Sequence, residues 1–382
     1  MSDTDADTLL ADSARDYLQR GYGAAVRAES LAHVQGCSAR RWQEFADMGW
    51  LALPLAEADG GLGGSMHDIC TLSEAMGQAL VIEPFVACAV LGSGLLSLAN
   101  DADVRAAWLP AMAEGRLRVA AAPLPSGVGA DHHSIPSRAR AAASGYTLQG
   151  QDSLVPGGHG AHAYLVLAMM DGGKETGLFL VAADAPGLRA TPCTLLDGQH
   201  AVTLELGTAA GSLLFQGAPD VVRRRVEAVQ ARAAVAHCAE TVGTMQRAFD
   251  ITIDYLKTRK QFGRTIASNQ VVQHRLVDLF VEITEARAVT YSAAAMMDQT
   301  APPDLPTLRH QVAAARACVL QAAHLVWNES VQLHGAIGMT DEYIVGQYVK
   351  RLVVAGSLHG SLEGELETLA AGALDGAQAG HG

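Results

Sequence analysis

The fold of this chain is decided by the stretch Tyr255-Leu-Lys-Thr-Arg-Lys-Gln-Phe-Gly-Arg-Thr-Ile266, which is followed by a second one, Gln332-Leu-His-Gly-Ala-Ile-Gly-Met-Thr-Asp-Glu-Tyr343. Taken alone, Arg259 in the first stretch would be a solvated charge at a helix end, because other cations lie nearby. Gln332 alone would be an ordinary surface amide. The Phe262-Gly263 turn, together with the ordered appearance of the second stretch, favours a binding role for both residues instead.

Around these stretches the chain divides into a helical, a β and a second helical part. Apolar residues from Ile69 to Met76 repeat at helical spacing. Short runs such as Ala163–Ala168 and Gly177–Val181 are punctuated by Gly, Pro and Asp, which is typical of strands and turns. From Pro219 the helical spacing returns, and Ala301–Asp304 separates two long helices. This order predicts three parts without βαβ alternation.

The same pattern argues against a nucleotide-binding Rossmann domain. Such a domain places a glycine-rich phosphate loop directly after a strand. The only similar sequence here is Asp59-Gly-Gly-Leu-Gly-Gly64, which follows no convincing strand. We therefore interpret it as a plain turn. The short helix expected from Asp101 to Gly115 is predicted to be interrupted at Pro110.

Composition limits the class of protein further. The chain has 382 residues and a net charge of −13, so the basic footprint of a nucleic-acid-binding protein is missing. No apolar run reaches the roughly 18 residues of a membrane span. The first residues lack the basic start of a signal segment, so we expect a cytoplasmic protein. Its six cysteines show no CxxC spacing, which predicts reduced core thiols and no metal site.

The two stretches resemble the paired C-terminal signatures of the acyl-CoA dehydrogenase family, whose members bind flavin adenine dinucleotide (FAD). The loop ending at Gly64 and the segment Trp108–Gly115 are similar to other parts of the family. The resemblance implies a mainly helical α+β fold with an N-terminal helical domain (1–117) and a middle β-barrel or sandwich domain (118–218). It also implies a C-terminal four-helix bundle (219–372), and the Ala- and Gly-rich end (373–382) is expected to be a flexible tail.

The resemblance also implies where FAD is held. Arg259 matches the residue that contacts the pyrophosphate, and Gln261, Phe262 and Gln270 match residues lining that site. The second signature is implied to reach the FAD of a neighbouring subunit through Gln332, Leu333, His334, Gly335 and Ala336. Ser126 remains from the β-domain stretch that touches the flavin in the family. His334 has an alternative role as a partly buried ring bonded to backbone. Sites shared in this way imply a dimer or larger assembly.

The family's catalytic base is missing from both of its usual places. The reaction removes a proton from the acyl α-carbon while a hydride leaves the β-carbon, so it needs a base with a suitable pKa. The usual glutamate near the C-terminus is replaced by His359, and the less common position on an earlier helix falls at or near Ala233. His359 and Glu240 remain as candidate bases. We expect Glu363 and Glu365 to be exposed helix charges instead.

The altered turn is similar to the small-subunit type of the family, as in the small subunit of pimeloyl-CoA dehydrogenase. The resemblance implies an FAD-dependent acyl-CoA dehydrogenase that forms a 2,3-enoyl-CoA and passes electrons to an electron-transfer flavoprotein. It implies an α2β2 heteromer in which a paralogue carries the glutamate. A non-catalytic, cofactor-completing subunit and an active homo-oligomer using His359 as base are the alternatives. The sequence leaves the acyl chain of the substrate open.

Overall fold

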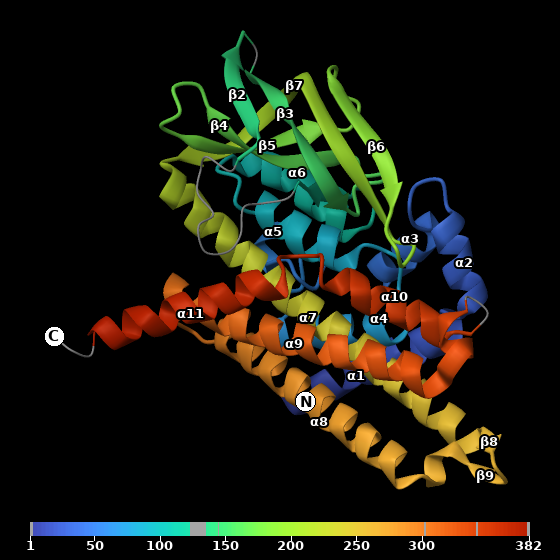
Figure 1. Cartoon of the computed structure of the whole chain (residues 1–382). Helices are drawn as coiled ribbons and strands as arrows, with labels where there is room; N and C mark the ends of the chain where they lie inside the picture. The colour runs from blue at the N-terminus through green and yellow to red at the C-terminus, as the bar shows by residue number, and fades with distance from the viewer. Residues whose placement is uncertain (1–2, 123–134, 144, 302, 341–342, 380–382) are drawn as a thin grey trace. The chain divides into compact units, whose positions relative to one another are not determined.

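The computed structural model describes residues 3–122, 135–143, 145–301, 303–340 and 343–379 (Figure 1). Backbone contacts divide the chain into two compact units. Unit 1 consists of residues 1–23, 70–81 and 234–382, and unit 2 consists of residues 24–69 and 82–233. Two helices, α4 (Met66–Gln78) and α7 (Pro219–Thr258), contribute residues to both units. This division does not test the three domains predicted from the sequence, which stay a prediction.

Unit 2 contains a closed β-barrel. Its strands are β1 (Val119–Ala121), β2 (Ser137–Ala142), β3 (Gly145–Pro156), β4 (Ala163–Met170), β5 (Thr176–Ala182), β6 (Leu188–Thr194) and β7 (His200–Gly217). Pairing runs from β4 to β2, β3, β7 and β5, and β5 pairs with β4 again. The ring therefore closes, and β1 and β6 are added to β4 and β7. Closure removes unpaired strand edges from the ring.

Unit 2 also contains short helices, some of which share a core with the barrel. They are α2 (Ala24–Ala32), α3 (Ala39–Asp47), η1 (Glu57–Asp59), the π-helical η2 (Phe85–Gly92), α5 (Ser93–Leu96) and α6 (Ala102–Ala113). Leu95, Leu165, Leu178 and Phe215 are among the fully buried residues of the shared core. The apolar runs of β4 and β5 are buried along most of their length because barrel and helices cover both faces.

Unit 1 is helical. It holds α1 (Asp3–Gly21), most of α4 and of α7, α8 (Gln270–Met297), α9 (Leu305–His334), α10 (Val345–Ala355) and α11 (Leu362–Ala379). A small hairpin of β8 (Lys260–Gln261) and β9 (Arg264–Thr265), with η4 (Ile266–Ser268), joins α7 to α8, and η5 (Gly335–Met339) follows α9. In Figure 1, α9 packs against α8, α10 and α11.

Glycines allow α4 and α7 to cross in close contact within unit 1. A Cβ added at Gly77 would overlap the carbonyl oxygen of Glu240, and one at Gly243 would overlap that of Glu74. The two backbones therefore touch reciprocally, and any larger side chain would push the helices apart. Thr244 adds a hydrogen bond from its hydroxyl to the carbonyl of Gly77 at 3.3 Å. This crossing fixes the position of Glu240 relative to α4.

Most elements expected from the sequence are present, and the fold class is confirmed. The sequence pattern did not predict β2 and β6. Their residues are largely exposed and polar, and Pro192 lies in β6.

The predicted interruption at Pro110 is wrong, since α6 continues through it to Ala113. The loop up to Gly64 is a turn, as expected, with Gly60 and Gly63 at positive φ. The last helix continues to Ala379, into the segment expected to be a flexible tail.

All six cysteines carry free thiols. Burial raises the pKa of Cys37 and of Cys238 to about 12 and that of Cys88 and of Cys318 to about 11. These thiols therefore remain protonated at neutral pH. Among the described residues, no helix is long and apolar enough to cross a membrane.

Candidate functional site

The first signature forms the exposed hairpin that follows α7. Lys260 pairs with Thr265 and Gln261 with Arg264, which leaves a two-residue loop with positive φ at Phe262 (51°) and Gly263 (80°). Positive φ at both loop positions is the pattern of a type I′ hairpin turn. A bulky residue with this backbone conformation is strained, so placing Phe262 in the turn costs conformational free energy. The ring is 100% exposed, as suits contact with a ligand or another chain.

Polar groups for an anion surround this hairpin. The side chains of Arg259, Gln261 and Gln270 are all exposed. None of these three side chains makes a hydrogen bond or ion pair with a side chain or backbone group in the part of the chain that the structure describes. A guanidinium and two amides without internal partners are suited to phosphate oxygens.

The second signature meets the first through Tyr255, one helical turn before Arg259. The Tyr255 ring stacks on the His334 ring with centroids 4.5 Å apart, and the Tyr255 hydroxyl donates to the His334 carbonyl at 3.3 Å. Tyr343 packs against both rings. The structure therefore brings the beginning of one signature and the end of α9 into one cluster.

His334 itself is buried, as in the alternative given by the sequence. Its Nδ1 lies 2.8 Å from the carbonyl oxygen of Ser330, while its Nε2 is buried without a hydrogen-bond partner in the described chain. Burial lowers the pKa of His334, so the ring is uncharged at neutral pH. Beyond it, Gly335 and Ala336 are exposed, like Gln332, while Leu333 is half-buried. Ser126, the remaining predicted cofactor residue, lies outside the described residues.

Arg316 on α9 holds the turn that contains His359, one of the two candidate bases. Its side chain is 2% exposed, and one nitrogen, Nη2, donates to the carbonyls of Leu358 (3.0 Å) and Gly360 (2.8 Å). Its Nε donates to the Glu365 carboxylate at 2.6 Å. The two carbonyls flank His359, which lies in the left-handed region at φ 60°. Charge-assisted bonds to both sides of this residue fix its backbone.

His237 on α7, which the sequence reasoning missed, lies against His359. The two imidazole centroids are 5.2 Å apart at 48°. Burial, with Arg316 nearby, lowers the pKa of His359 to about 3. Burial also places the pKa of His237 well below its ordinary value, and the neighbouring His359, Arg316 and Arg351 act in the same direction. Its position one turn after Ala233, in an apolar run, was the available signal.

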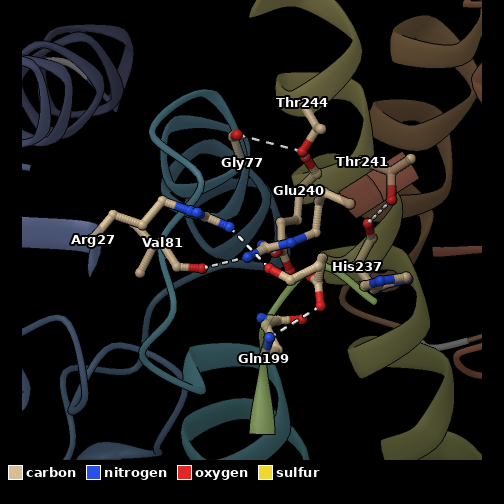
Figure 2. A network of polar contacts seen from close by, with 10 residues as sticks. Arg27, Gly77, Val81, Gln199, His237, Glu240, Thr241 and Thr244 are labelled. Carbon is tan, nitrogen blue, oxygen red and sulfur yellow. Dashed lines mark hydrogen bonds and ion pairs between the residues drawn. The ribbon is translucent and has the colours of Figure 1, made fainter. Parts of the chain in front are cut away.

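Glu240, the second candidate base, is engaged by Arg351 of α10. Arg351 donates to the Glu240 carboxylate at 2.6 Å and to the Val81 carbonyl at 2.9 Å, and the two charged side chains are 4% (Arg351) and 15% (Glu240) exposed. Figure 2 shows Glu240 and Val81 in this network, with His237 three residues earlier on α7. This ion pair favours a structural role for Glu240, because the buried guanidinium of Arg351 needs a counter-charge.

Of the two remaining carboxylates near the turn, one is paired with an arginine and the other is exposed to solvent. Glu365 pairs with Arg316, which differs from the exposed helix charge that we expected. Glu363 is exposed, as expected. Ala233 is fully buried and has no titratable group. Around His359, the described carboxylates are therefore paired with arginine or face solvent.

Comparisons with known proteins identify similar domains. Residues 4–116 match a family model described as acyl-CoA dehydrogenase, N-terminal domain, and residues 226–374 match the corresponding C-terminal domain. Acyl-CoA dehydrogenase FadE12 of Mycobacterium tuberculosis is 29% identical over an alignment of 313 positions, which covers 79% of this chain and 79% of the relative.

Two solved structures are similar over almost the whole chain. The first, a variant of the Tcur3481-Tcur3483 steroid ACAD, has a TM-score of 0.86 and 26% identity and covers 98% of this chain and 99% of that one. The second, the ChsE4-ChsE5 complex from Mycobacterium tuberculosis, has a TM-score of 0.84 and 24% identity and covers 97% of both chains. At this identity the second likeness supports the fold alone.

Removing the charge of Glu240 tests whether it is structural. Glu240→Gln leaves Arg351 without its counter-charge, so we expect the free energy of unfolding to fall by about 1–3 kcal/mol in denaturant titrations. The control Glu363→Gln changes an exposed carboxylate and leaves stability unchanged. Loss of turnover without loss of stability in Glu240→Gln would instead identify a catalytic carboxylate.

The histidine pair predicts a specific dependence of stability on pH. The folded imidazoles stay neutral, whereas an unfolded histidine takes up a proton below about pH 6.5. Stability is therefore present above this pH and is lost progressively as the pH falls toward about 3, the pKa of His359. In His359→Gln the slope of unfolding free energy against pH should decrease by up to about 1.4 kcal/mol per pH unit. An unchanged slope, equal to that of the exposed-site control His310→Gln, would contradict this account.

Proposed function

This chain belongs to the acyl-CoA dehydrogenase family, and we propose that it is one subunit of a heteromeric, FAD-dependent enzyme that converts an acyl-CoA to its 2,3-enoyl-CoA. In this proposal a paralogous partner carries the glutamate base, and electrons leave to an electron-transfer flavoprotein in the cytoplasm. The observation that carries the proposal is that arginines bind the carboxylates near His359. Glu365 and Glu240 are each bound by a buried arginine, so neither is poised to take an α-proton.

The residues of the two signatures fit FAD, the cofactor that family membership implies. Arg259 offers a guanidinium to the pyrophosphate, and Gln261 and Gln270 offer amides, all without other partners in the described chain. The fully exposed ring of Phe262 offers an apolar contact. In the second signature, the buried Nε2 of His334 has no hydrogen-bond partner in the described residues. This atom is therefore available to a group from outside the described chain.

The chain's own contribution to the reaction is to bind and to orient. When bound, FAD supplies the acceptor for the hydride that leaves the acyl β-carbon. Arg259 and the two amides would neutralise and orient the pyrophosphate. The exposed residues of the Gln332–Ala336 segment would contact the cofactor held by a neighbouring subunit. Removal of the α-proton requires a base with a pKa closer to neutrality than that of His359, which burial lowers to about 3.

The name of one similar protein supports a heteromer. A solved structure that is 26% identical to this chain is described by a pair of names, Tcur3481-Tcur3483. It is called a steroid ACAD, which makes bulky alicyclic acyl groups one class of substrate to test beside linear ones.

The chain expressed alone should retain oxidised flavin in the presence of acyl-CoA. We expect no bleaching of the visible flavin spectrum without oxygen when linear or steroidal acyl-CoAs are added, because no base is available. Co-expression with a glutamate-bearing paralogue should restore bleaching. Bleaching by the lone chain would establish a complete site in one polypeptide and favour a homo-oligomer that uses His359. A heteromer that does not bleach would favour a purely structural subunit.

Arg259 should dominate cofactor affinity. Arg259→Gln removes a charge-assisted contact to the pyrophosphate, and we expect FAD to bind about ten- to a hundredfold more weakly in titrations followed by flavin fluorescence. Arg264→Gln, on the same exposed hairpin, is the matched control and should leave the affinity unchanged. Equal weakening in both variants would show that overall charge, and not Arg259, attracts the cofactor.

A further inference from the structure

The imidazole rings of His237 and His359 come together within unit 1. His237 lies on α7, and its ring contacts that of His359 with centroids 5.2 Å apart. The resemblance to the family implied a glutamate base at the position of His359. Instead of a carboxylate, this place contains two imidazoles.

The hydrogen-bonding capacity of these rings is not used within the described chain. His237 is 6% exposed, yet neither its ring nitrogens nor those of the half-buried His359 are bonded to a described residue. Their nitrogens are therefore available to form hydrogen bonds with a group from outside the described residues. The ring of His334, by comparison, is bonded through one nitrogen to the Ser330 carbonyl. The His237–His359 pair thus lacks an oxygen partner among the residues described.

Charges around the pair are balanced. Arg316 is paired with Glu365 and Arg351 with Glu240, each at 2.6 Å. Burial and the nearby arginines keep both imidazoles uncharged. A neutral imidazole can donate an N–H hydrogen bond. Because each of these two cations has its counter-charge, the site is better suited to a neutral oxygen than to a carboxylate.

We propose that His237 and His359 donate ring N–H hydrogen bonds to the thioester carbonyl oxygen of an acyl-CoA and that this chain binds the substrate there without removing its α-proton. The inference rests on the proposed function, since it requires that this chain binds acyl-CoA. It assigns His237 to ligand binding and makes His359 a donor instead of a base. Arg316 acts as a positioning residue, because it holds the turn on both sides of His359.

Isotope-edited infrared spectroscopy of the full chain tests the inference directly. Butyryl-CoA and octanoyl-CoA labelled with ¹³C at the carbonyl are added to the chain as isolated, and the carbonyl stretch is compared with that of the free thioester. We expect a shift to lower frequency that is lost in His237→Phe and reduced in His359→Gln, with about tenfold weaker binding. His237→Asn retains an N–H donor and should restore part of the shift. His310→Gln, at an exposed position of α9, is the control and should behave like the unaltered chain.

Three outcomes would overturn the inference. An unchanged shift in a folded, ligand-binding His237→Phe variant would remove the histidine pair from the site while leaving the proposed function intact. Tighter binding of glutaryl-CoA than of butyryl-CoA, abolished in His237→Phe, would show that the pair takes a carboxylate. Failure of the unaltered chain to bind any of these thioesters would also overturn it, and the flavin-bleaching experiment with a partner would still decide the proposed function separately.

Discussion

The candidate acyl site depends on the hydrogen bonds of the buried Arg316 guanidinium. It joins three elements of unit 1, since it extends from α9, donates to two carbonyls of the turn before α11, and pairs with Glu365 on α11. Removing such a cation from water is costly unless its donors are used. That requirement fixes the turn, keeps His359 in a left-handed conformation, and places its ring on His237.

Arg351 repeats this arrangement on the neighbouring helix. It pairs with Glu240 on α7 and binds the carbonyl of Val81, so Glu240 and Glu365 each have an arginine of their own. The result is a site whose charges cancel and whose remaining polar groups are imidazoles. A family reaction that needs a carboxylate base therefore has no suitable group among the residues described around the turn, which is why we assign the base to a partner.

Sequence reasoning predicted the parts of the molecule that depend on local pattern. The long helices, the buried strands β4 and β5 and the Phe262-Gly263 turn follow from spacing and turn chemistry. The exposed strand β6 and the closure of the barrel did not follow, because they arise from pairing between distant strands. Arg259 and Gln332 were predicted as cofactor contacts from motifs, and that role stays a prediction. His237 was not predicted, because its contact with His359 joins residues that lie far apart in the sequence.

The buried thiols have a consequence for how the two units can be observed. Thiol reagents attack the thiolate, and burial raises the pKa of Cys37, Cys88 and Cys238 so far that almost none is present in the folded protein at neutral pH. Cys37 and Cys88 belong to unit 2, whereas Cys238 belongs to unit 1. Each unit therefore contains its own reporter of opening, because the rate at which these buried cysteines are alkylated measures how often that unit opens.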